Sequence, residues 1–299
     1  GLDFPPESHS LVRMSTRFRI VIIVIGATGE LIARALAPID CAKLVAGSCR
    51  TESKGRQFAA AFACEWFADT SRMLDEARPD VAIICTPSGT HLEATLAAAE
   101  RGIHVLCEKP LEITSARVQA MIDATKRNKV WLGGLFPQRF NAVNVAVHDA
   151  AAQGRLGTLA AISAAVPWWR NDAYYAPDRW QGKADLDGGG ALMNQAIHTI
   201  DLMQWFAAAT MPELAPAANP VQSVFAITAR RGHDPKLLEV EDTAGATMTF
   251  RNGAIGQLFA ATSAYPGRRR RYLVAGRDGS MEAVEDQLLA FDFRVQQPD

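Results

Sequence analysis

A lysine and a histidine are the side chains in this sequence best placed to exchange a proton near neutral pH. Lys109 lies in the triplet Glu108-Lys109-Pro110, directly after an apolar run. Proline disfavours helical geometry at the residue before it, so Lys109 is expected to extend over a crevice beyond the strand end. A lysine partly withdrawn from water has a lowered pKa and can exchange protons near neutrality. Taken alone, a lysine is most often a solvated surface residue.

His198 is the second candidate, in a segment that predicts one long helix beginning near Gly190. Asn194 and His198 are spaced to share one helical face, and Asp201 is expected close enough to orient the imidazole. A lone helical histidine is more often a hydrogen-bonded core residue. The preceding glycines, Gly188–Gly190, permit close approach of a ligand and therefore favour a functional histidine.

The elements that must position these residues alternate between short apolar runs and helical stretches from Arg19 to about Phe136. This pattern predicts a parallel sheet covered by helices on both faces. The predicted strands are Ile20–Ile25, Lys43–Ser48, Asp80–Cys85, Ile103–Cys107 and Val130–Leu135, and the predicted helices are Glu30–Leu36, Lys54–Glu65, Thr90–Arg101 and Thr114–Lys126.

After Pro137 the pattern changes to strands without intervening helices, apart from the long helix near Gly190. It predicts an open, mostly antiparallel second sheet, with strands at Leu159–Val166, Ser223–Arg230, Ala244–Phe250, Ala254–Ala261 and Tyr272–Gly276. The fold class is therefore α/β: a Rossmann-type domain over 14–137 followed by an α+β domain over 138–299. Residues 1–13 are expected to be a disordered leader.

A dinucleotide site is predicted where the first strand meets its helix. The turn reads Gly26-Ala27-Thr28-Gly29, and glycines there let the backbone approach a pyrophosphate at the helix N-terminus. The motif is incomplete as a G-x-G-x-x-G, because Thr28 takes the second glycine position and the third glycine is missing.

The second strand ends without the carboxylate that usually binds the ribose of NAD. Ser48 and Arg50 offer a donor and a positive charge there instead, which favours NADP over NAD, although Arg50 could also be a solvated residue. A short-chain dehydrogenase is excluded, because none of the tyrosines (Tyr174, Tyr175, Tyr265, Tyr272) has a lysine four residues later.

Aromatic and hydrogen-bonding side chains in the second domain are typical of a carbohydrate site. For Trp168 and Trp169 a core or oligomer contact is an equal alternative. The predicted substrate-binding residues are Arg139, Asn141, Arg170, Tyr175, Trp180, Gln195 and Tyr265.

Composition excludes several classes of protein. The net charge of -1, without a long basic run, argues against a nucleic-acid or anionic-membrane partner. The five cysteines form no CxxC pair, which favours reduced thiols in the cytoplasm over a disulfide framework, and no metal site is predicted. The apolar run Ile20–Ile25 is too short to span a membrane.

Four segments together resemble the Gfo/Idh/MocA family, named for glucose-fructose oxidoreductase and inositol dehydrogenase. They follow the family's order between about Phe18 and Gly279, and they are Thr86-Pro87-Ser88-Gly89-Thr90-His91, Glu108-Lys109-Pro110, Gln138-Arg139-Phe140-Asn141 and the stretch from Gly188 to Asp201.

This resemblance implies an enzyme that transfers a hydride between NAD(P) and a secondary alcohol of a sugar, polyol or sugar derivative. It implies that Lys109 binds the reacting hydroxyl, that His198 serves as acid/base, and that Asn194 orients or hydrogen-bonds there. The cofactor would be lined by Thr86, Pro87, His91, Glu108, Lys109 and Gln138. It further implies a homodimer or homotetramer formed through the open sheet.

The sequence departs from the family pattern in the glycine motif, at Asn194, where many members have aspartate, and after Gly279, where members normally continue with a helical segment. A missing tail is expected to expose apolar surface. These departures keep open a catalytically inactive, dinucleotide-binding or sensor-like relative. A structural protein without a cofactor is a third possibility.

Overall fold

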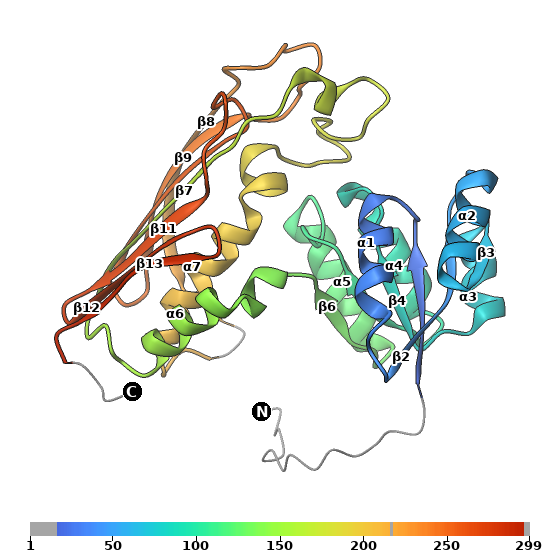
Figure 1. Ribbon diagram of the computed structural model, residues 1–299, viewed down its shortest axis with the longest axis horizontal. Helices are drawn as coiled ribbons and strands as arrows, with labels where there is room; N and C mark the ends of the chain where they lie inside the picture. Colours follow the sequence, from blue (N-terminus) through green and yellow to red (C-terminus); the bar gives the residue numbers. More distant parts are fainter. Residues whose placement is uncertain (1–16, 216–217, 296–299) are drawn as a thin grey trace. The chain divides into compact units, whose positions relative to one another are not determined.

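The computed structural model describes residues 17–215 and 218–295, so the predicted leader at 1–13 lies outside the described residues. The chain forms two compact units, which are described separately (Figure 1). Among the described residues, the first comprises 17–86, Glu93–Cys107 and Met121–Gly133, and the second comprises Pro87–Leu92, Glu108–Ala120, 134–215 and 218–295. Within the described ranges, no helix has the length and apolar character needed to cross a membrane, and no cluster of His, Cys, Asp or Glu could hold a metal ion.

The first unit contains a six-stranded sheet in the order β3-β2-β1-β4-β5-β6. Its strands are β1 (Phe18–Ile23), β2 (Ala42–Ser48), β3 (Glu65–Phe67), β4 (Val81–Ile84), β5 (His104–Cys107) and β6 (Leu132–Gly134). The pairs β1–β2, β1–β4, β2–β3 and β4–β5 are parallel. Strand β4 is apolar throughout, and the last four residues of β1 are buried apolar residues, because helices cover both faces of the sheet. The predicted Rossmann-type sheet is therefore confirmed.

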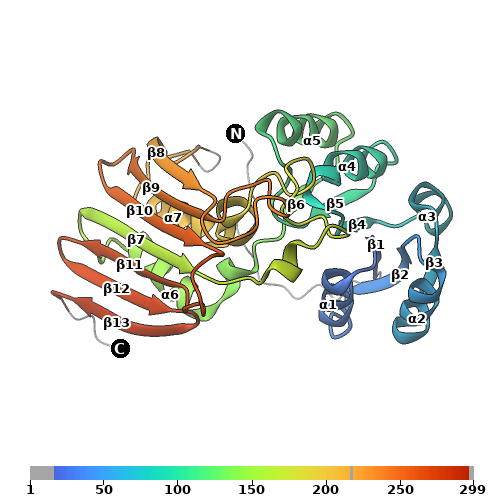
Figure 2. The ribbon, with the colours of Figure 1, turned by 90° about the horizontal axis from the view of Figure 1, so that it is seen from above.

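Helices connect the strands and are distributed over the two faces of this sheet (Figure 2). Figure 2 shows α1 (Ala27–Leu36) and α2 (Glu52–Phe62) on one face, and α3 (Thr70–Ala77), α4 (His91–Ala99) and α5 (Ser115–Arg127) on the other. The order of the strands reverses direction between β1 and β4, which is where ligands bind in open sheets of this kind.

The second unit is built on a seven-stranded sheet in the order β13-β12-β11-β7-β10-β9-β8. Its strands are β7 (Leu159–Pro167), β8 (Val221–Ala229), β9 (Thr243–Phe250), β10 (Ile255–Ala261), β11 (Arg271–Gly276), β12 (Gly279–Val284) and β13 (Gln287–Phe293). All neighbouring pairs are antiparallel except β7 with β10. This confirms the predicted second sheet as mostly antiparallel.

Two helices, α6 (Ala142–Ala152) and α7 (Ile197–Ala209), cover one face of this second sheet (Figure 1). The core between helices and sheet contains Phe206, Met203 and Phe250, all almost fully buried. Alternate residues of the strands point to the opposite face, which carries no helix. The second unit therefore has one covered and one open sheet face.

Several sequence predictions are corrected by the structure. After Pro137 the sequence predicts only the helix near Gly190, but the structure also has α6 there. The sequence of α6 is apolar on nearly every side because the helix is largely enclosed. The single helix expected near Gly190 is instead a π-helical turn, η4 (Ala191–Gln195), followed by α7. The elements β3, α3, β12 and β13 were also missing from the prediction.

Candidate functional site

The turn between β1 and α1 has the geometry of a complete dinucleotide-binding turn, although one of its glycine positions holds a valine. Val24 follows β1 with φ of 68°, a left-handed conformation that favours glycine. Gly26 is the N-cap of α1. Gly29 allows close helix–strand packing, since a Cβ there would lie 3.1 Å from the Val24 carbonyl oxygen. The prediction that the third glycine is missing was wrong: Val24, Gly26 and Gly29 occupy the three positions.

The start of α1 is suited to a dinucleotide pyrophosphate. The N-cap Gly26 provides no side-chain cap, so the first backbone N–H groups of the helix can bind another acceptor. Gly26, Ala27 and Thr28 are exposed, and a Cβ on Gly26 would meet nothing within 4 Å. These residues fit the cofactor that the sequence predicts.

At the end of β2, the two predicted cofactor contacts differ. The side chain of Ser48 is buried, and its hydroxyl accepts from Val24 N at 3.4 Å and lies 3.0 Å from the Thr70 hydroxyl. The hydroxyl of Ser48 therefore stabilises the turn. Arg50 is exposed at the strand end.

Lys109, in the second unit, is partly buried, and a backbone carbonyl of the segment before His198 holds its side chain. Its Nζ donates to the Asn194 carbonyl oxygen at 2.9 Å, and its backbone N–H donates to the Glu108 carboxylate at 3.1 Å. Burial lowers the pKa of Lys109, while the carboxylates of Glu108 and Asp187 raise it and Arg170 lowers it further. Lys109 is therefore an ammonium group fixed in place and easier to deprotonate than an exposed lysine.

His198, on α7, is a neutral imidazole with an unused buried nitrogen. Its pKa is lowered to about 4, mainly by burial and then by the positive charges of Lys109 and Arg270. Within the described part of the chain, its Nδ1 has no hydrogen-bond partner. The predicted orienting residue is corrected, because the carboxylate of Asp201 instead accepts two hydrogen bonds from Arg139, at 2.6 and 2.7 Å.

The glycine triplet before η4 packs against the protein's own chain. A Cβ on Gly188, whose φ is 72°, would overlap Ile113, and one on Gly190 would overlap the Glu241 carbonyl. The Glu241 carboxylate also accepts from Gly190 N at 3.0 Å and from Leu192 N at 2.8 Å. The expectation that these glycines admit a ligand is therefore corrected for Gly188 and Gly190, which admit other parts of the chain.

Asp187 is a buried acid of this site that the sequence predictions missed. Its carboxylate accepts from Gly182 N at 2.8 Å and from the Asn194 side-chain amide. Burial raises the pKa of Asp187 to about 6. The signal in the sequence was the pair Asp187-Gly188, which is typical of a tight turn. In the structure Gly188 adopts a positive φ, as such a turn requires.

Arg170 and Gln195 are brought together with Asn194. Arg170 Nη2 donates to Gln195 Oε1 at 2.7 Å, and Gln195 Nε2 donates to Asn194 Oδ1 at 2.9 Å and to the Tyr174 hydroxyl at 3.1 Å. The guanidinium of Arg170 also lies over the rings of Trp168 and Tyr174. Arg170 is partly exposed, so this cluster links the buried Asn194 to one partly exposed guanidinium.

The structure gives the other predicted substrate residues different surroundings. Tyr175 is buried and donates to Thr262 Oγ1 at 3.0 Å. Asn141 caps α6 by accepting from Val143 N at 2.9 Å, and Arg139 is paired with Asp201 as described. Trp180 is half-buried, whereas Tyr265 is exposed and packs edge-on against Trp169.

Two of the residues predicted to line the cofactor, His91 and Gln138, make hydrogen-bond contacts within the second unit. His91 is buried, and its Nδ1 lies 2.9 Å from the Pro110 carbonyl oxygen, beside the Glu108-Lys109-Pro110 turn. The Gln138 side-chain oxygen accepts from Asn144 at 3.3 Å. Pro87 and Glu108 are half-buried in this unit, and Thr86 is half-buried at the end of the first unit.

Comparison with known proteins identifies the family. Residues 18–134 match the oxidoreductase family with an NAD-binding Rossmann fold, and residues 145–282 match the Gfo/Idh/MocA C-terminal domain. The chain belongs to the Gfo/Idh/MocA family.

Relatives in this family act on sugars and polyols. The chain is 31% identical over 229 residues to levoglucosan dehydrogenase of Pseudarthrobacter phenanthrenivorans, covering 72% of this chain and 57% of that protein. It is 27% identical to myo-inositol 2-dehydrogenase of Thermotoga maritima, over 89% of this chain and 75% of the relative. The WlbA dehydrogenase of Bordetella pertussis, solved with NADH and UDP-GlcNAcA, has a TM-score of 0.87 at 29% identity, over 95% of this chain and 79% of that one.

Proposed function

We propose that this protein is an NAD(P)-dependent oxidoreductase that transfers a hydride between nicotinamide and a secondary alcohol of a sugar, polyol or sugar derivative. One observation carries the proposal: the second unit holds a partly buried lysine ammonium, Lys109, and near it a neutral histidine, His198, with an unpartnered nitrogen among the described residues. Family membership supports it, as does the exposed start of α1, which has no side-chain cap.

In the direction of oxidation, the side chains have separate tasks. The ammonium of Lys109 holds the hydroxyl oxygen and stabilises the negative charge that develops on it. The imidazole of His198 takes the hydroxyl proton on its unprotonated nitrogen, because its lowered pKa keeps it neutral at pH 7. Asn194 holds Lys109 through its carbonyl oxygen and is a positioning residue. The bound nicotinamide would accept the hydride from carbon.

Two measurements test this function. Fluorescence titration with NADH and NADPH should show saturable binding. A screen of levoglucosan, myo-inositol, simple sugars and nucleotide-sugars should then show an absorbance change at the nicotinamide band with at least one class. Binding without any turnover would instead support an inactive, sensor-like relative. Absence of binding would support a structural protein.

The inactive alternative is favoured by one observation, the valine at the first glycine position of the nucleotide turn. Val24 holds a conformation that costs a β-branched residue about 1–2 kcal/mol. The turn nevertheless leaves the N-terminus of α1 exposed. Retention of both Lys109 and His198 supports the enzyme, because a binding module needs neither.

We further propose that NADP is preferred over NAD, and this preference now rests on Arg50. Its exposed guanidinium suits a 2′-phosphate, and β2 ends without a carboxylate. The Arg50→Ala variant should weaken NADPH binding about tenfold, equivalent to about 1.4 kcal/mol, and leave NADH binding nearly unchanged. Equal loss for both cofactors would contradict the preference.

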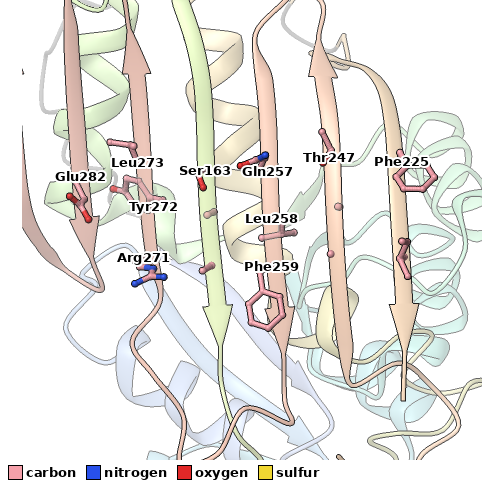
Figure 3. A pocket seen from close by; sticks show the side chains of 15 residues that line it. Ser163, Phe225, Thr247, Gln257, Leu258, Phe259, Arg271, Tyr272, Leu273 and Glu282 are labelled. Carbon is pink, nitrogen blue, oxygen red and sulfur yellow. The ribbon is translucent and has the colours of Figure 1, made fainter. Parts of the chain in front are cut away.

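The open face of the second sheet supports the proposed homodimer or homotetramer. Figure 3 shows Phe225, Phe259 and Leu273 among the side chains of a hollow on this face, while Tyr272 and Leu258 point into the buried core. Such an exposed apolar surface is typical of a protein interface. Phe225→Asp should lower the mass measured by light scattering after size-exclusion chromatography. Leu31→Asp, which changes an exposed leucine on α1, should not.

The cytoplasmic location also stays a proposal, supported by five scattered cysteines that form no CxxC pair.

A further inference from the structure

A buried chain of amide groups connects Asp187 to Arg170. Asp187 accepts from Asn194 Nδ2, Asn194 Oδ1 accepts from Gln195 Nε2, and Gln195 Oε1 accepts from Arg170 Nη2. Asp187, Asn194 and Gln195 are each less than a tenth exposed, at 1%, 7% and 7%. The chain thus runs from a buried anion to a partly exposed cation.

The direction of this chain is set at its acidic end. An ionised carboxylate can only accept hydrogen bonds, and the Asp187 carboxylate accepts from Gly182 N as well as from Asn194. Asn194 must therefore turn its NH₂ towards Asp187 and its oxygen towards Gln195. Gln195 must then present its oxygen to Arg170, which has only donors.

The same aspartate influences Lys109. Asn194 is the residue whose carbonyl oxygen binds Lys109 Nζ, and the negative charge of Asp187 acts on the Lys109 ammonium. The other charged groups acting on Lys109 and Asp187 are Glu108, Arg170 and Glu241. Among them, Asp187 is the acid tied by hydrogen bonds to the residue that holds Lys109.

We propose that Asp187 is the positioning residue of the site: its carboxylate fixes the amide direction that presents Gln195 to Arg170, and it supplies the buried negative charge opposite Lys109. The importance of Lys109 and Arg170 for a substrate rests on the proposed function. The geometry of the Asp187 chain does not depend on turnover and can be tested without it.

Exchanging the acid and the amide is the sharpest test. In Asp187→Asn, the single amide oxygen cannot replace both carboxylate oxygens, which accept from Gly182 N and from Asn194. Either one of these buried donors loses its acceptor, or the side-chain amides of Asn194 and Gln195 turn over, so that Gln195 presents its NH₂ group to Arg170. In Asn194→Asp, two carboxylates face each other. The double variant Asp187→Asn/Asn194→Asp satisfies every group: the amide introduced in place of Asp187 accepts from Gly182 N and donates to the new carboxylate, which also accepts from Gln195.

The readout is the pH dependence of acetic anhydride labelling at Lys109, followed by peptide mass spectrometry on the free protein. Asp187→Asn removes a negative charge, so the labelling midpoint should move to lower pH by about one unit, about a tenfold increase in labelling at a fixed pH below the midpoint. Asn194→Asp should move it to higher pH. The double variant should return labelling to within about threefold of the wild type.

The matched control is Asp185→Asn, an exposed aspartate of the same loop, which should leave the profile unchanged. The proposal is overturned if Asp187→Asn behaves like Asp185→Asn, or if the double variant lies no closer to the wild type than the single variants. If Asp187→Asn does not fold, a folded double variant with a wild-type profile supports the proposal, and an unfolded one overturns it. None of these outcomes depends on finding a substrate.

Discussion

Gly26 and Gly190 both stand immediately before a helical segment, yet different surroundings require each of them. Gly26 is exposed, and a side chain there would meet no protein atom within 4 Å. Gly190 is buried, and a side chain there would overlap the backbone of Glu241. A glycine before a helix therefore has different surroundings in the two cases: Gly190 admits the protein's own backbone, whereas Gly26 leaves the start of α1 open.

The largest expected effect comes from the buried member of this pair. Gly190→Ala forces a Cβ into the Glu241 carbonyl, which cannot move away without breaking the contacts of β9 and η4. We expect a loss of about 3 kcal/mol or more in the free energy of unfolding, measured by urea denaturation. A stability close to wild type would show that the triplet is not held by packing.

Gly26→Ala should give the opposite pattern. Its extended backbone, with φ of −139°, accepts alanine, so stability should change by less than about 1 kcal/mol. The new methyl group would stand where a phosphate approaches α1, so the NADH dissociation constant should rise about tenfold. Unchanged cofactor affinity would argue against a phosphate at this turn.

The histidine and the aspartate of the second unit should respond to acid in opposite ways. The pKa of His198, about 4 against an ordinary 6.5, means that its contribution to stability is complete above pH 6.5 and is lost as the pH falls towards 4. The pKa of Asp187, raised from 3.8 to about 6, means that its protonation below pH 6 favours the folded chain.

Urea denaturation at about pH 7 and about pH 4.5 tests both signs, because these values lie on either side of the Asp187 pKa and of the ordinary histidine pKa. When the pH is lowered from about 7 to about 4.5, the free energy of unfolding should fall less in His198→Gln than in the wild type. In Asp187→Asn it should fall more. The same loss in His198→Gln as in the wild type would mean that the imidazole is already protonated in the folded chain.

The smallest effect is expected at Val24. Val24→Gly relieves a left-handed valine but gives the unfolded chain more freedom, so the two changes nearly cancel. Stability should stay within about 1 kcal/mol of the wild type. Val21→Gly, at a fully buried strand position nearby, should cost about 3 kcal/mol or more. A similar cost at both positions would contradict the assignment of Val24 to a glycine position.

Elements with strong local patterns could be predicted from the sequence, and those without such patterns could not. The apolar runs of β1 and β4 and the alternation in the second sheet specify their strands locally. The three-residue strand β3 is too short to show a pattern, and the enclosed helix α6 lacks a polar face. The π-helical turn at Ala191–Gln195 arises from contacts with Glu241, far away in sequence.

The same distinction applies to the site. Lys109 and His198 stand in recognisable motifs. The partners of Asp201 and Tyr175 are instead set by contacts with Arg139 and Thr262, many residues away. Nothing in the local sequence predicts that Asp187 reaches the Asn194 side chain, because this contact depends on the turn at Gly188 and the start of η4.

The most direct test of the proposed activity is the turnover of Lys109→Ala at saturating cofactor, with the sugar or polyol that the substrate screen identifies. The account predicts that kcat falls by about 10²–10⁴-fold while the dissociation constant for NADH and the unfolding temperature stay close to wild type. The exposed Lys126→Ala serves as the matched control and should retain full turnover. Near-normal turnover of Lys109→Ala would contradict the account.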